Sequence, residues 1–379
     1  MIPLNRNLDG LRRSPIRAYT NLANETPGCV KLTIGEPEQD TPENIRAAAA
    51  AALGEGLTHY APNQGIPALR AAVAAFESRR GHPVPPDQVL VTVGATQALY
   101  TALTGILNPG EEVIIPTPGF VLYESIVVAA GGVPRYLDLS KTDFQIRKEE
   151  LFPLVNGKTK AIILNSPNNP TGVVLDAESM AAVKAAVLGK PVFVICDNVY
   201  QALSDIPCPD LSLDRELEEQ VLVCQSFSKP WAMTGWRLGY LTAPGYVMEK
   251  LLLLSAATIA SVPTFLQAAA VEALATDPGP LAETFRRRRR YAASRLREMG
   301  LSFPEPEGAF YLFPRVTDFG MDSDTFCRRL IREAKVAAVP GSCFGCEGYI
   351  RISCCCADED LKEGLDRLEG FLKTLPGRG

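Results

Sequence analysis

Short apolar runs alternate with amphipathic segments along the middle of the chain. Between residues 88 and 242, β-rich runs such as PVFVICD alternate with segments such as TQALYTALTGIL, whose apolar positions have helical spacing. The runs are almost continuously apolar, as strands are when both faces of a sheet are covered. The pattern therefore predicts an α/β fold with a mostly parallel central sheet and helices on both faces.

The two ends of the chain differ from this middle part. Residues 1–30 are polar and irregular, whereas residues 281–300 have the pattern of a long charged helix. The rest of the C-terminal third combines a few short apolar runs with amphipathic helical patterns. We therefore expect a large domain over residues 40–275 and a smaller α+β domain that joins residues 1–39 to residues 276–379.

The most apolar segment, residues 251–274, is interrupted by polar residues and by Pro263. A membrane span needs about 20 predominantly apolar residues, so this segment indicates two buried helices that meet near Pro263. The chain also lacks a positively charged start followed by an apolar run. We therefore expect a cytoplasmic protein without a membrane partner.

The charge of the chain gives no support to nucleic-acid binding. The formal net charge is −5, which provides no overall attraction for a polyanion. The run RRRRR at residues 286–290 would bind nucleic acid best as one basic stripe, but five consecutive residues point all round a helix. We expect a solvated helix face at this run and no nucleic-acid partner.

The cysteines and histidines do not form the pattern of a metal site. Without an export signal, the ten cysteines are expected to be reduced. Cys343 and Cys346 form a C-x-x-C in a glycine-flanked loop, and Cys354–Cys356 are adjacent, so packing roles are expected for them. The only histidines are His59 and His82, which nearly excludes a multi-histidine metal site and disfavours a serine-histidine-aspartate triad. The sequence thus predicts no metal.

A candidate anion site follows an early apolar run. Gly94, Ala95 and Thr96 come after this run and open a helical pattern. Small residues let backbone N–H groups approach an anion, and a helix N-terminus favours negative charge. A phosphate fits this position, although an ordinary tight turn between strand and helix explains the same pattern.

Polar residues also follow two later apolar runs. Asn169 lies in the turn NSPNNPTG, and Asp197 comes directly after PVFVIC, with Tyr200 three positions further on. Open α/β sheets bind ligands at the carboxyl ends of their strands, where a buried carboxylate needs a positive partner. Turn chemistry at Asn169 and helix capping by Asp197 are the structural alternatives.

A lysine stands in an unusual setting in the stretch QSFSKPWAMTGWRLGYL. The neighbours of Lys229 are apolar or small, which lowers the pKa of an amine and makes it a better nucleophile. Arg237 and the hydroxyls of Ser226 and Ser228 suit a phosphate. Together with the candidate anion site at Gly94–Thr96 and the carboxylate of Asp197, these residues suit a ligand with a phosphate, a protonated ring nitrogen and an aldehyde. Pyridoxal 5′-phosphate has all three.

The chain resembles the class I/II aminotransferases of the aspartate aminotransferase-like, fold type I group. From about residue 30 to the end, the motifs LTIGEPE, YAPNQGIPALR, VGATQAL, NSPNNPTG, DNVY, SFSKPWAMTGWRLGY and RIS occur in the order of that family and at its approximate spacings. The resemblance implies the fold type I architecture with a smaller α+β domain, pyridoxal 5′-phosphate as the cofactor and a homodimer as the active unit.

The resemblance also implies roles for individual residues. Lys229 forms a Schiff base with the cofactor and moves the proton at the substrate Cα, while Asp197 pairs with the pyridinium nitrogen. Asn169 and Tyr200 bind the phenolic oxygen of the cofactor, and Tyr60 reaches the phosphate in the neighbouring subunit. Further cofactor contacts are expected from Gly94, Ala95, Thr96, Ser226, Ser228 and Arg237, and from Phe120 unless it belongs to the core. The α-carboxylate of the substrate is expected at Gly35, Asn169 and Arg351.

The identity of the substrate is less well determined. Some bacterial aspartate-specific members of the family have a lysine where this chain has Thr96, which weakens an assignment to aspartate. The substrate side chain is expected near Ile16, Arg17, Tyr19, Thr96 and Phe344. Among these residues, Arg17 is a hypothetical partner for a distal carboxylate.

The sequence therefore predicts an aminotransferase that moves the amino group of an L-amino acid to a 2-oxo acid by a ping-pong mechanism. The same fold hosts other reactions, so a C–S β-lyase or another α/β-elimination stays open, as do the amino donor and the acceptor. A regulator that senses its ligand with this fold is disfavoured, because the roughly 30 residues before LTIGEPE are too few for a DNA-binding domain.

Overall fold

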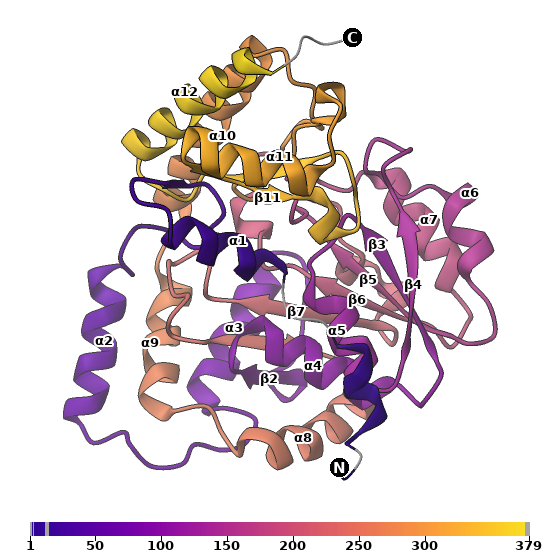
Figure 1. Ribbon diagram of the computed structural model, residues 1–379. Helices are drawn as coiled ribbons and strands as arrows, with labels where there is room; N and C mark the ends of the chain where they lie inside the picture. The colour runs from indigo at the N-terminus through magenta and orange to yellow at the C-terminus, as the bar shows by residue number, and fades with distance from the viewer. Residues whose placement is uncertain (1, 3, 12–14, 376–379) are drawn as a thin grey trace.

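The computed structural model describes residues 2, 4–11 and 15–375. At its centre lies a seven-stranded sheet with the strand order β2-β8-β7-β6-β5-β3-β4 (Figure 1). Strand β8 is antiparallel to both of its neighbours, and the other neighbouring strands are parallel. The predicted α/β fold with a mostly parallel sheet is confirmed. The strands span Val89–Thr92 (β2), Glu112–Thr117 (β3), Val133–Asp138 (β4), Thr159–Asn165 (β5), Phe193–Asp197 (β6), Val221–Ser226 (β7) and Gly239–Thr242 (β8).

Helices cover both faces of this sheet. Successive residues of a strand point to opposite sides, so each strand packs against both layers of helices. In β3, Val113 and Ile115 pack into the hydrophobic cluster of one face, whereas Ile114 packs into a cluster of the other. The first face carries α4 (Gly94–Ile106), α5 (Leu122–Ala129) and α8 (Gly245–Ile259). The second carries α2 (Glu43–Gly54), α3 (Pro67–Arg79), α6 (Lys148–Leu151), α7 (Ala177–Val187) and α9 (Thr264–Ala275).

A second group of elements lies above the sheet in Figure 1. Its hydrophobic cluster draws on residues 19–32 and 292–375, the two chain segments that the predicted small domain joins. The bounds of that domain stay a prediction. The helices of this group are α1 (Pro15–Asn24), α10 (Gly279–Glu298), α11 (Ser323–Arg329) and α12 (Asp358–Thr374). Its strands are β1 (Val30–Lys31), β9 (Tyr311–Leu312), β10 (Val336–Ala337), β11 (Val339–Pro340) and β12 (Ile350–Ser353).

The apolar segment 251–274 forms two helices, as predicted. Helix α8 ends at Ile259, and α9 begins at Thr264, directly after Pro263. Within the described ranges, no helix combines the length and the apolar character that a membrane crossing requires.

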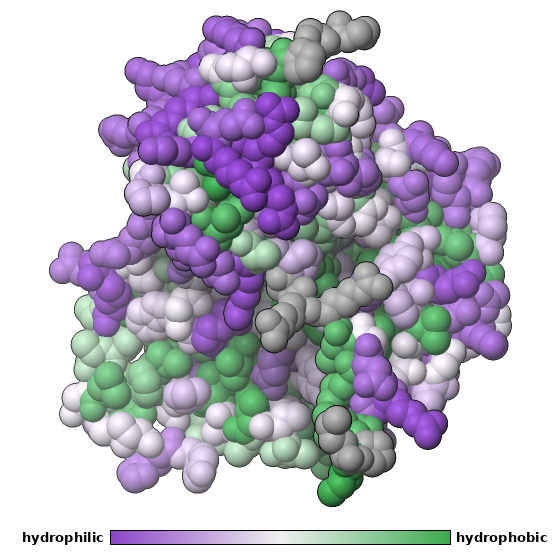
Figure 2. Space-filling view, in the orientation of Figure 1, coloured by the Kyte–Doolittle hydropathy of each residue, from purple (hydrophilic) through white to green (hydrophobic). Residues whose placement is uncertain are grey.

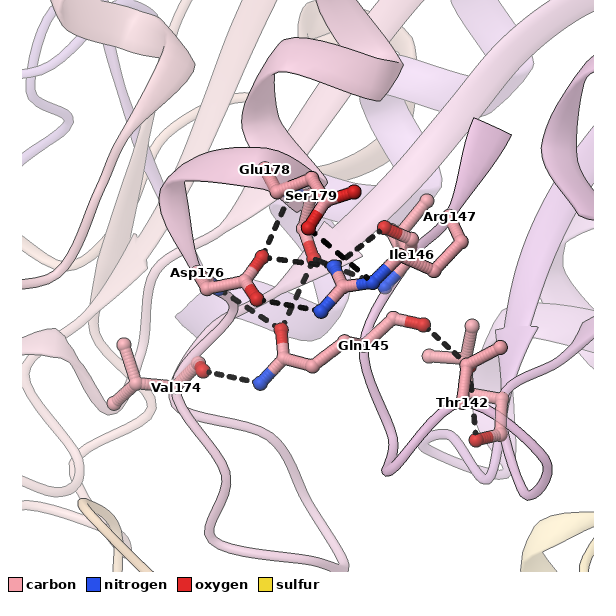
Figure 3. A network of polar contacts seen from close by, with 9 residues as sticks. Thr142, Gln145, Ile146, Arg147, Val174, Asp176, Glu178 and Ser179 are labelled. Atoms are coloured by element: carbon pink, nitrogen blue, oxygen red, sulfur yellow. Dashed lines mark hydrogen bonds and ion pairs between the residues drawn. The ribbon is translucent and has the colours of Figure 1, made fainter. Parts of the chain in front are cut away.

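A polar network fixes the start of α7 on the second face of the sheet (Figure 3). The Asp176 carboxylate accepts a hydrogen bond of 2.7 Å from the backbone N–H of Ser179, which is the pattern of an N-cap. It also lies 2.7 Å from the Arg147 guanidinium, and this hydrogen bond is the main cause that lowers the pKa of Asp176 to about 2. Gln145 continues the network with a hydrogen bond of 3.0 Å to the carbonyl of Val174.

The expectation of a solvated helix face at residues 286–290 is wrong for two of the five arginines. Arg288 and Arg289 in α10 are buried. Arg288 forms ion pairs with Glu38 and Asp358, and Arg289 forms an ion pair with Asp205. A buried guanidinium is tolerated only when it is paired, and here the carboxylates come from distant parts of the chain. The buried arginines therefore connect α10 to other segments.

Candidate active site

A cavity of about 520 Å³ opens at the carboxyl ends of β5, β6 and β7. One part of its wall comes from residues that follow these strands, and another from α1, from the segment after β1 and from β9 and β12. The structure thus brings together residues that are far apart in the sequence. The predicted site residues in the cavity wall are Gly35, Ala95, Thr96, Phe120, Asn169, Asp197, Tyr200, Ser226, Ser228, Lys229, Arg237 and Arg351.

Asp197 is the last residue of β6, and its side chain is buried. Its Oδ2 accepts a hydrogen bond of 2.5 Å from the hydroxyl of Tyr123, whereas Oδ1 has no partner among the described residues. Burial raises the pKa of Asp197 to about 6, and the hydrogen bonds from Tyr123 and the Val199 backbone oppose this rise only in part. The free oxygen of a buried carboxylate is a place for a ligand that carries a positive charge or an N–H group.

Lys229 lines the same cavity and follows the end of β7 by three residues. Its Nζ donates a hydrogen bond of 2.6 Å to the carbonyl of Gly35 and lies 5.9 Å from the centre of the Phe310 ring. Burial lowers the pKa of Lys229, and the guanidinium groups of Arg237 and Arg351 act in the same direction. The surroundings thus favour the neutral amine, which is the nucleophilic form.

Arg237 and the start of α4 form a place for an anion. A Cβ at Gly94, whose φ is +72°, would lie 2.8 Å from a terminal nitrogen of Arg237, so glycine lets the guanidinium approach the first turn of the helix. Arg237 is exposed to the cavity, and Ser226 and Ser228 line the same cavity. Backbone N–H groups of a helix start, a guanidinium and two hydroxyls together suit a phosphate.

Arg351 in β12 is buried but not isolated. It donates hydrogen bonds of 2.9 Å to Oδ1 of Asn169 and 2.7 Å to the carbonyl of Thr33. The Cζ atom of Arg351 lies 4.5 Å from the ring centre of Tyr311 and 4.9 Å from that of Phe344. The Nε–H has no partner within the described part of the chain, so this guanidinium retains a donor for a carboxylate.

Sequence reasoning missed several residues of the site. Tyr123 holds Asp197, and its ring meets the Phe120 ring edge to face, with 5.5 Å between the ring centres. Asn165, at the end of β5, donates a hydrogen bond of 2.8 Å to the carbonyl of Asp197 and accepts one of 2.9 Å from the backbone N–H of Asn169. Only Asn165 had a detectable signal, because it is a polar residue at the end of an apolar run.

The family model described as aminotransferase class I and II matches residues 27–368. The chain belongs to the class I and II aminotransferase family. It is 40% identical to aromatic-amino-acid aminotransferase 2 of Thermococcus litoralis, over 98% of both chains. It is also 40% identical to the aspartate aminotransferase of Pyrococcus abyssi, over 97% of both chains.

Solved structures agree with this assignment. The aspartate aminotransferase of Thermotoga maritima superposes with a TM-score of 0.93 at 36% identity and covers 98% of this chain and 100% of its own. A Pyrococcus structure titled protein-A1 superposes with a TM-score of 0.93 at 39% identity, over 97% of this chain and 98% of its own. The protein is therefore an aminotransferase, an enzyme of the transferase class.

Residues of α1 also line the aminotransferase cavity. Ile16 and Thr20, one helical turn apart on α1, line it together with Ile34 and Leu99. Arg17 is exposed and is not among the lining residues, so the structure gives no support to a distal carboxylate partner at this position. Tyr19 and Phe344 line an adjacent cavity of about 710 Å³.

Three predicted features lie outside the cavity wall: Gly94, which directly precedes the lining residue Ala95, Tyr60, and the cysteines. Tyr60 has 92% of its surface exposed and does not line the cavity of its own subunit. All ten cysteines lie in the described part of the chain and are free thiols, and most are buried. Among the described residues, no group of three or more histidine, cysteine, aspartate or glutamate side chains could hold a metal ion.

Proposed function

We propose that this aminotransferase uses pyridoxal 5′-phosphate to move the amino group of an L-amino acid to a 2-oxo acid by a ping-pong mechanism. One observation carries the proposal. An amine with a lowered pKa, on Lys229, shares one cavity with the free oxygen of buried Asp197 and with the anion site at Arg237. These are the three groups that the aldehyde, the ring nitrogen and the phosphate of this cofactor need.

The residues of the cavity fit the cofactor group by group. Asp197 would hold the ring nitrogen through Oδ1, and Arg237, Ser226, Ser228 and the first N–H groups of α4, at Gly94, Ala95 and Thr96, would hold the phosphate. Asn169 and Tyr200 would bind the phenolic oxygen, and the Phe120 ring would cover the pyridine ring. When bound, the cofactor supplies an electron sink that withdraws charge from the substrate Cα.

The remaining steps belong to residues of this chain. Lys229 would hold the cofactor aldehyde at rest and, after release, would move the proton at the substrate Cα, because burial lowers the pKa of this amine and makes the neutral, proton-accepting form easier to reach. Arg351, supported by Asn169, holds the α-carboxylate through its free Nε–H and a terminal nitrogen. A carboxylate held in this way is retained, which favours transamination over decarboxylation.

We further propose that the preferred amino donor has an uncharged side chain. The two relatives at 40% identity are named for aromatic amino acids and for aspartate. Among the described residues of the cavity wall, the cations Lys229, Arg237 and Arg351 all have roles in the proposed site, and the wall also includes the apolar residues Ile16, Ile34 and Leu99. An apolar wall binds an apolar or aromatic side chain by removing its surface from water.

A donor panel tests this proposal. With the cofactor and one fixed 2-oxo acid, we expect phenylalanine and leucine to give a higher kcat/KM than aspartate. The new amino acid should appear in equal amount to the donor that is consumed. Release of ammonia and pyruvate from a donor with a β leaving group, without a new amino acid, would instead indicate elimination.

The active unit is proposed to be a homodimer in which Tyr60 reaches the phosphate site of the partner. Tyr60 is exposed and lies outside its own cavity. In Figure 2, apolar surface gathers over the lower part of the molecule around α2, α8 and α9, and the exposed apolar residues include Leu53, Leu57 and Leu253. A surface of this kind is typical of subunit interfaces.

Mixing two inactive variants tests this arrangement. A dimer of one Lys229→Ala subunit and one Tyr60→Ala subunit contains one site with both changes and one unchanged site. Random exchange should therefore recover about one quarter of the wild-type activity at limiting cofactor. No recovery after subunit exchange would contradict the contribution of Tyr60 across the interface.

A further inference from the structure

Tyr311 lies between two residues that have separate tasks in the proposed mechanism. Its ring contacts the guanidinium of Arg351, with 4.5 Å between Cζ and the ring centre. Its hydroxyl lies 3.0 Å from the hydroxyl of Tyr200. We propose that Tyr311 is a positioning residue that couples the carboxylate-binding Arg351 to the cofactor-binding Tyr200. This inference rests on the proposed function and assigns a role to a residue that the motifs did not single out.

The backbone brings Tyr311 to this place. Strand β9 pairs antiparallel with β12, with Ser353 opposite Tyr311 and Ile352 opposite Leu312, so Tyr311 and Arg351 lie on neighbouring strands. The Tyr311 side chain is buried, with 1% of its surface exposed, and its hydroxyl lies next to Gly35. A Cβ at Gly35 would collide with the Tyr311 hydroxyl, so glycine at this position leaves room for it.

The two hydroxyls define a direction for the hydrogen bond. Each phenol has one proton to donate. A charged oxygen of a ligand attracts the Tyr200 proton more strongly than the neutral oxygen of another phenol does. When Tyr200 donates to the cofactor, its own oxygen is left to accept a hydrogen bond from Tyr311. Hydrogen bonds in such a chain strengthen one another, so Tyr311 makes Tyr200 a better donor.

A buried arginine holds the chain segments that carry both phenols. Arg289 donates a hydrogen bond to the carbonyl of Ala309, two residues before Tyr311, and pairs with Asp205, five residues after Tyr200. The backbone N–H of Asp205 also donates a hydrogen bond of 2.7 Å to the carbonyl of Glu307. Arg289, which was expected on a solvated helix face, therefore holds the chain segments of Tyr200 and Tyr311 together.

Phe344 provides a matched comparison. Its ring also contacts Arg351, with 4.9 Å between Cζ and the ring centre, but no hydrogen bond of its side chain leads to Tyr200. Tyr311→Phe removes the hydroxyl and keeps the ring, whereas Phe344→Leu removes one ring from Arg351 and leaves the phenol pair intact. The two changes therefore separate the two halves of the proposed coupling.

The experiment uses the holoenzyme. The holoenzyme is titrated with pH, and the midpoint is the pH at which its visible absorption band is half converted. For Tyr311→Phe, we expect this midpoint to rise by about 0.5–1 pH unit, which corresponds to the loss of one ordinary hydrogen bond. The dissociation constant of 3-phenylpropanoate, a simple carboxylate analogue, should change less than about 2-fold, because the ring on Arg351 is retained. Phe344→Leu should raise that constant about 3–10-fold and leave the midpoint in place.

Further variants make the test independent of any one substitution. Tyr200→Phe should also raise the midpoint, and the double variant with Tyr311→Phe should show little further change, because both act through one hydrogen-bond chain. Gly35→Ala, which displaces the Tyr311 hydroxyl, should move the midpoint in the same direction. An unchanged midpoint in both Tyr311→Phe and Gly35→Ala, or fully additive shifts in the double variant, would overturn the coupling. A wild-type protein that gains no visible band with pyridoxal 5′-phosphate would refute the proposed function itself.

Discussion

The cavity has two walls, and the buried group that each wall leaves with an unpartnered atom differs in charge: among the described residues, a carboxylate on one wall and a guanidinium on the other. The strand-end wall consists of Asn169, Asp197, Tyr200, Ser226 and Lys229, and it leaves Oδ1 of a buried carboxylate without a partner among the described residues. The C-terminal wall consists of Tyr311 and Arg351, backed by Phe344. Here the guanidinium is held by two hydrogen bonds and two rings, and its Nε–H is free.

This difference indicates what each wall binds. A buried carboxylate with a raised pKa is costly in the free protein and becomes favourable when a ligand supplies the missing partner. The strand-end wall therefore suits a group that stays bound throughout turnover. The Arg351 guanidinium is already held in place by two hydrogen bonds and keeps one donor without a partner among the described residues, so it can bind and release a substrate carboxylate in each half of a ping-pong cycle.

The largest effect is expected on the strand-end wall. Lys229→Ala removes both the attachment point of the cofactor and the group that moves the proton at Cα. Steady-state assays should show a loss of at least about 10³-fold in kcat. An unchanged thermal midpoint of the ligand-free protein is the control for folding. Turnover within 10-fold of wild type would contradict the assignment of this wall.

A smaller loss, of a different kind, is expected on the C-terminal wall. Arg351→Leu should lower kcat/KM for every amino acid donor by about 10²-fold, because a charge-assisted bidentate contact is lost. The visible band of the holoenzyme should keep its intensity, since Arg351 is not expected to hold the cofactor. If the variant failed to bind the cofactor while substrate affinity was retained, the division between the two walls would be wrong.

The ligand-free protein should show the cost of Asp197 in its stability. The pKa of Asp197 is raised to about 6 in the folded state, against about 3.9 in an unfolded chain. Between these values the folded state binds more protons than the unfolded state, so this group lowers the free energy of unfolding as pH rises from about 4 to above 6. Relative to the wild type, Asp197→Asn should therefore gain stability over this range, by up to about 3 kcal/mol.

Asp176 provides a matched control with the opposite sign. Its pKa is lowered to about 2 by Arg147, so its contribution to stability is present above about pH 4 and is lost as pH falls towards 2. Asp176→Asn should be less stable than the wild type near neutral pH and should approach it in acid. Denaturant unfolding of the three ligand-free proteins between about pH 2 and 8 measures both effects. If the free energies of unfolding of Asp197→Asn and the wild type changed in parallel with pH, the raised pKa of Asp197 in the folded protein would be contradicted.

The smallest effect is expected at Arg17. This residue is exposed and does not line the cavity, whereas Ile16 beside it does. Arg17→Ala should change the ratio of kcat/KM for aspartate and alanine by less than about 2-fold. Ile16→Ala should lower kcat/KM for phenylalanine by about 3–10-fold, because apolar contact is lost. A large change in the aspartate-to-alanine ratio for Arg17→Ala would restore the hypothesis of a distal carboxylate partner.

The strand-end wall was predictable because each of its residues follows an apolar run. A polar residue at the end of a buried strand is a local signal, and it indicated Asp197 and the turn with Asn169, whereas Lys229 stood out as a cation among apolar and small neighbours. The fold class followed from the same alternation of strands and helices. The places of Arg351 and Tyr60 came only from the resemblance to the family.

The residues that were missed or misjudged depend on contacts between distant segments. Tyr123 and Tyr311 stand in apolar patterns typical of core residues, and nothing local shows that their hydroxyls meet Asp197 and Tyr200. Arg288 and Arg289 were expected in solvent, because their carboxylate partners lie far away in the sequence. Which neighbour of Arg17 faces the cavity depends on the rotation of α1, which the helical period alone does not fix.

The most direct test of the central claim is a single half of the reaction, followed by absorption spectroscopy. Holoenzyme at known concentration is mixed with an amino acid donor in the absence of any acceptor. We predict that the visible band falls, that one 2-oxo acid is released per subunit without ammonia, and that adding a 2-oxo acid restores the band. A band that stays unchanged while ammonia accumulates would contradict amino transfer at Lys229.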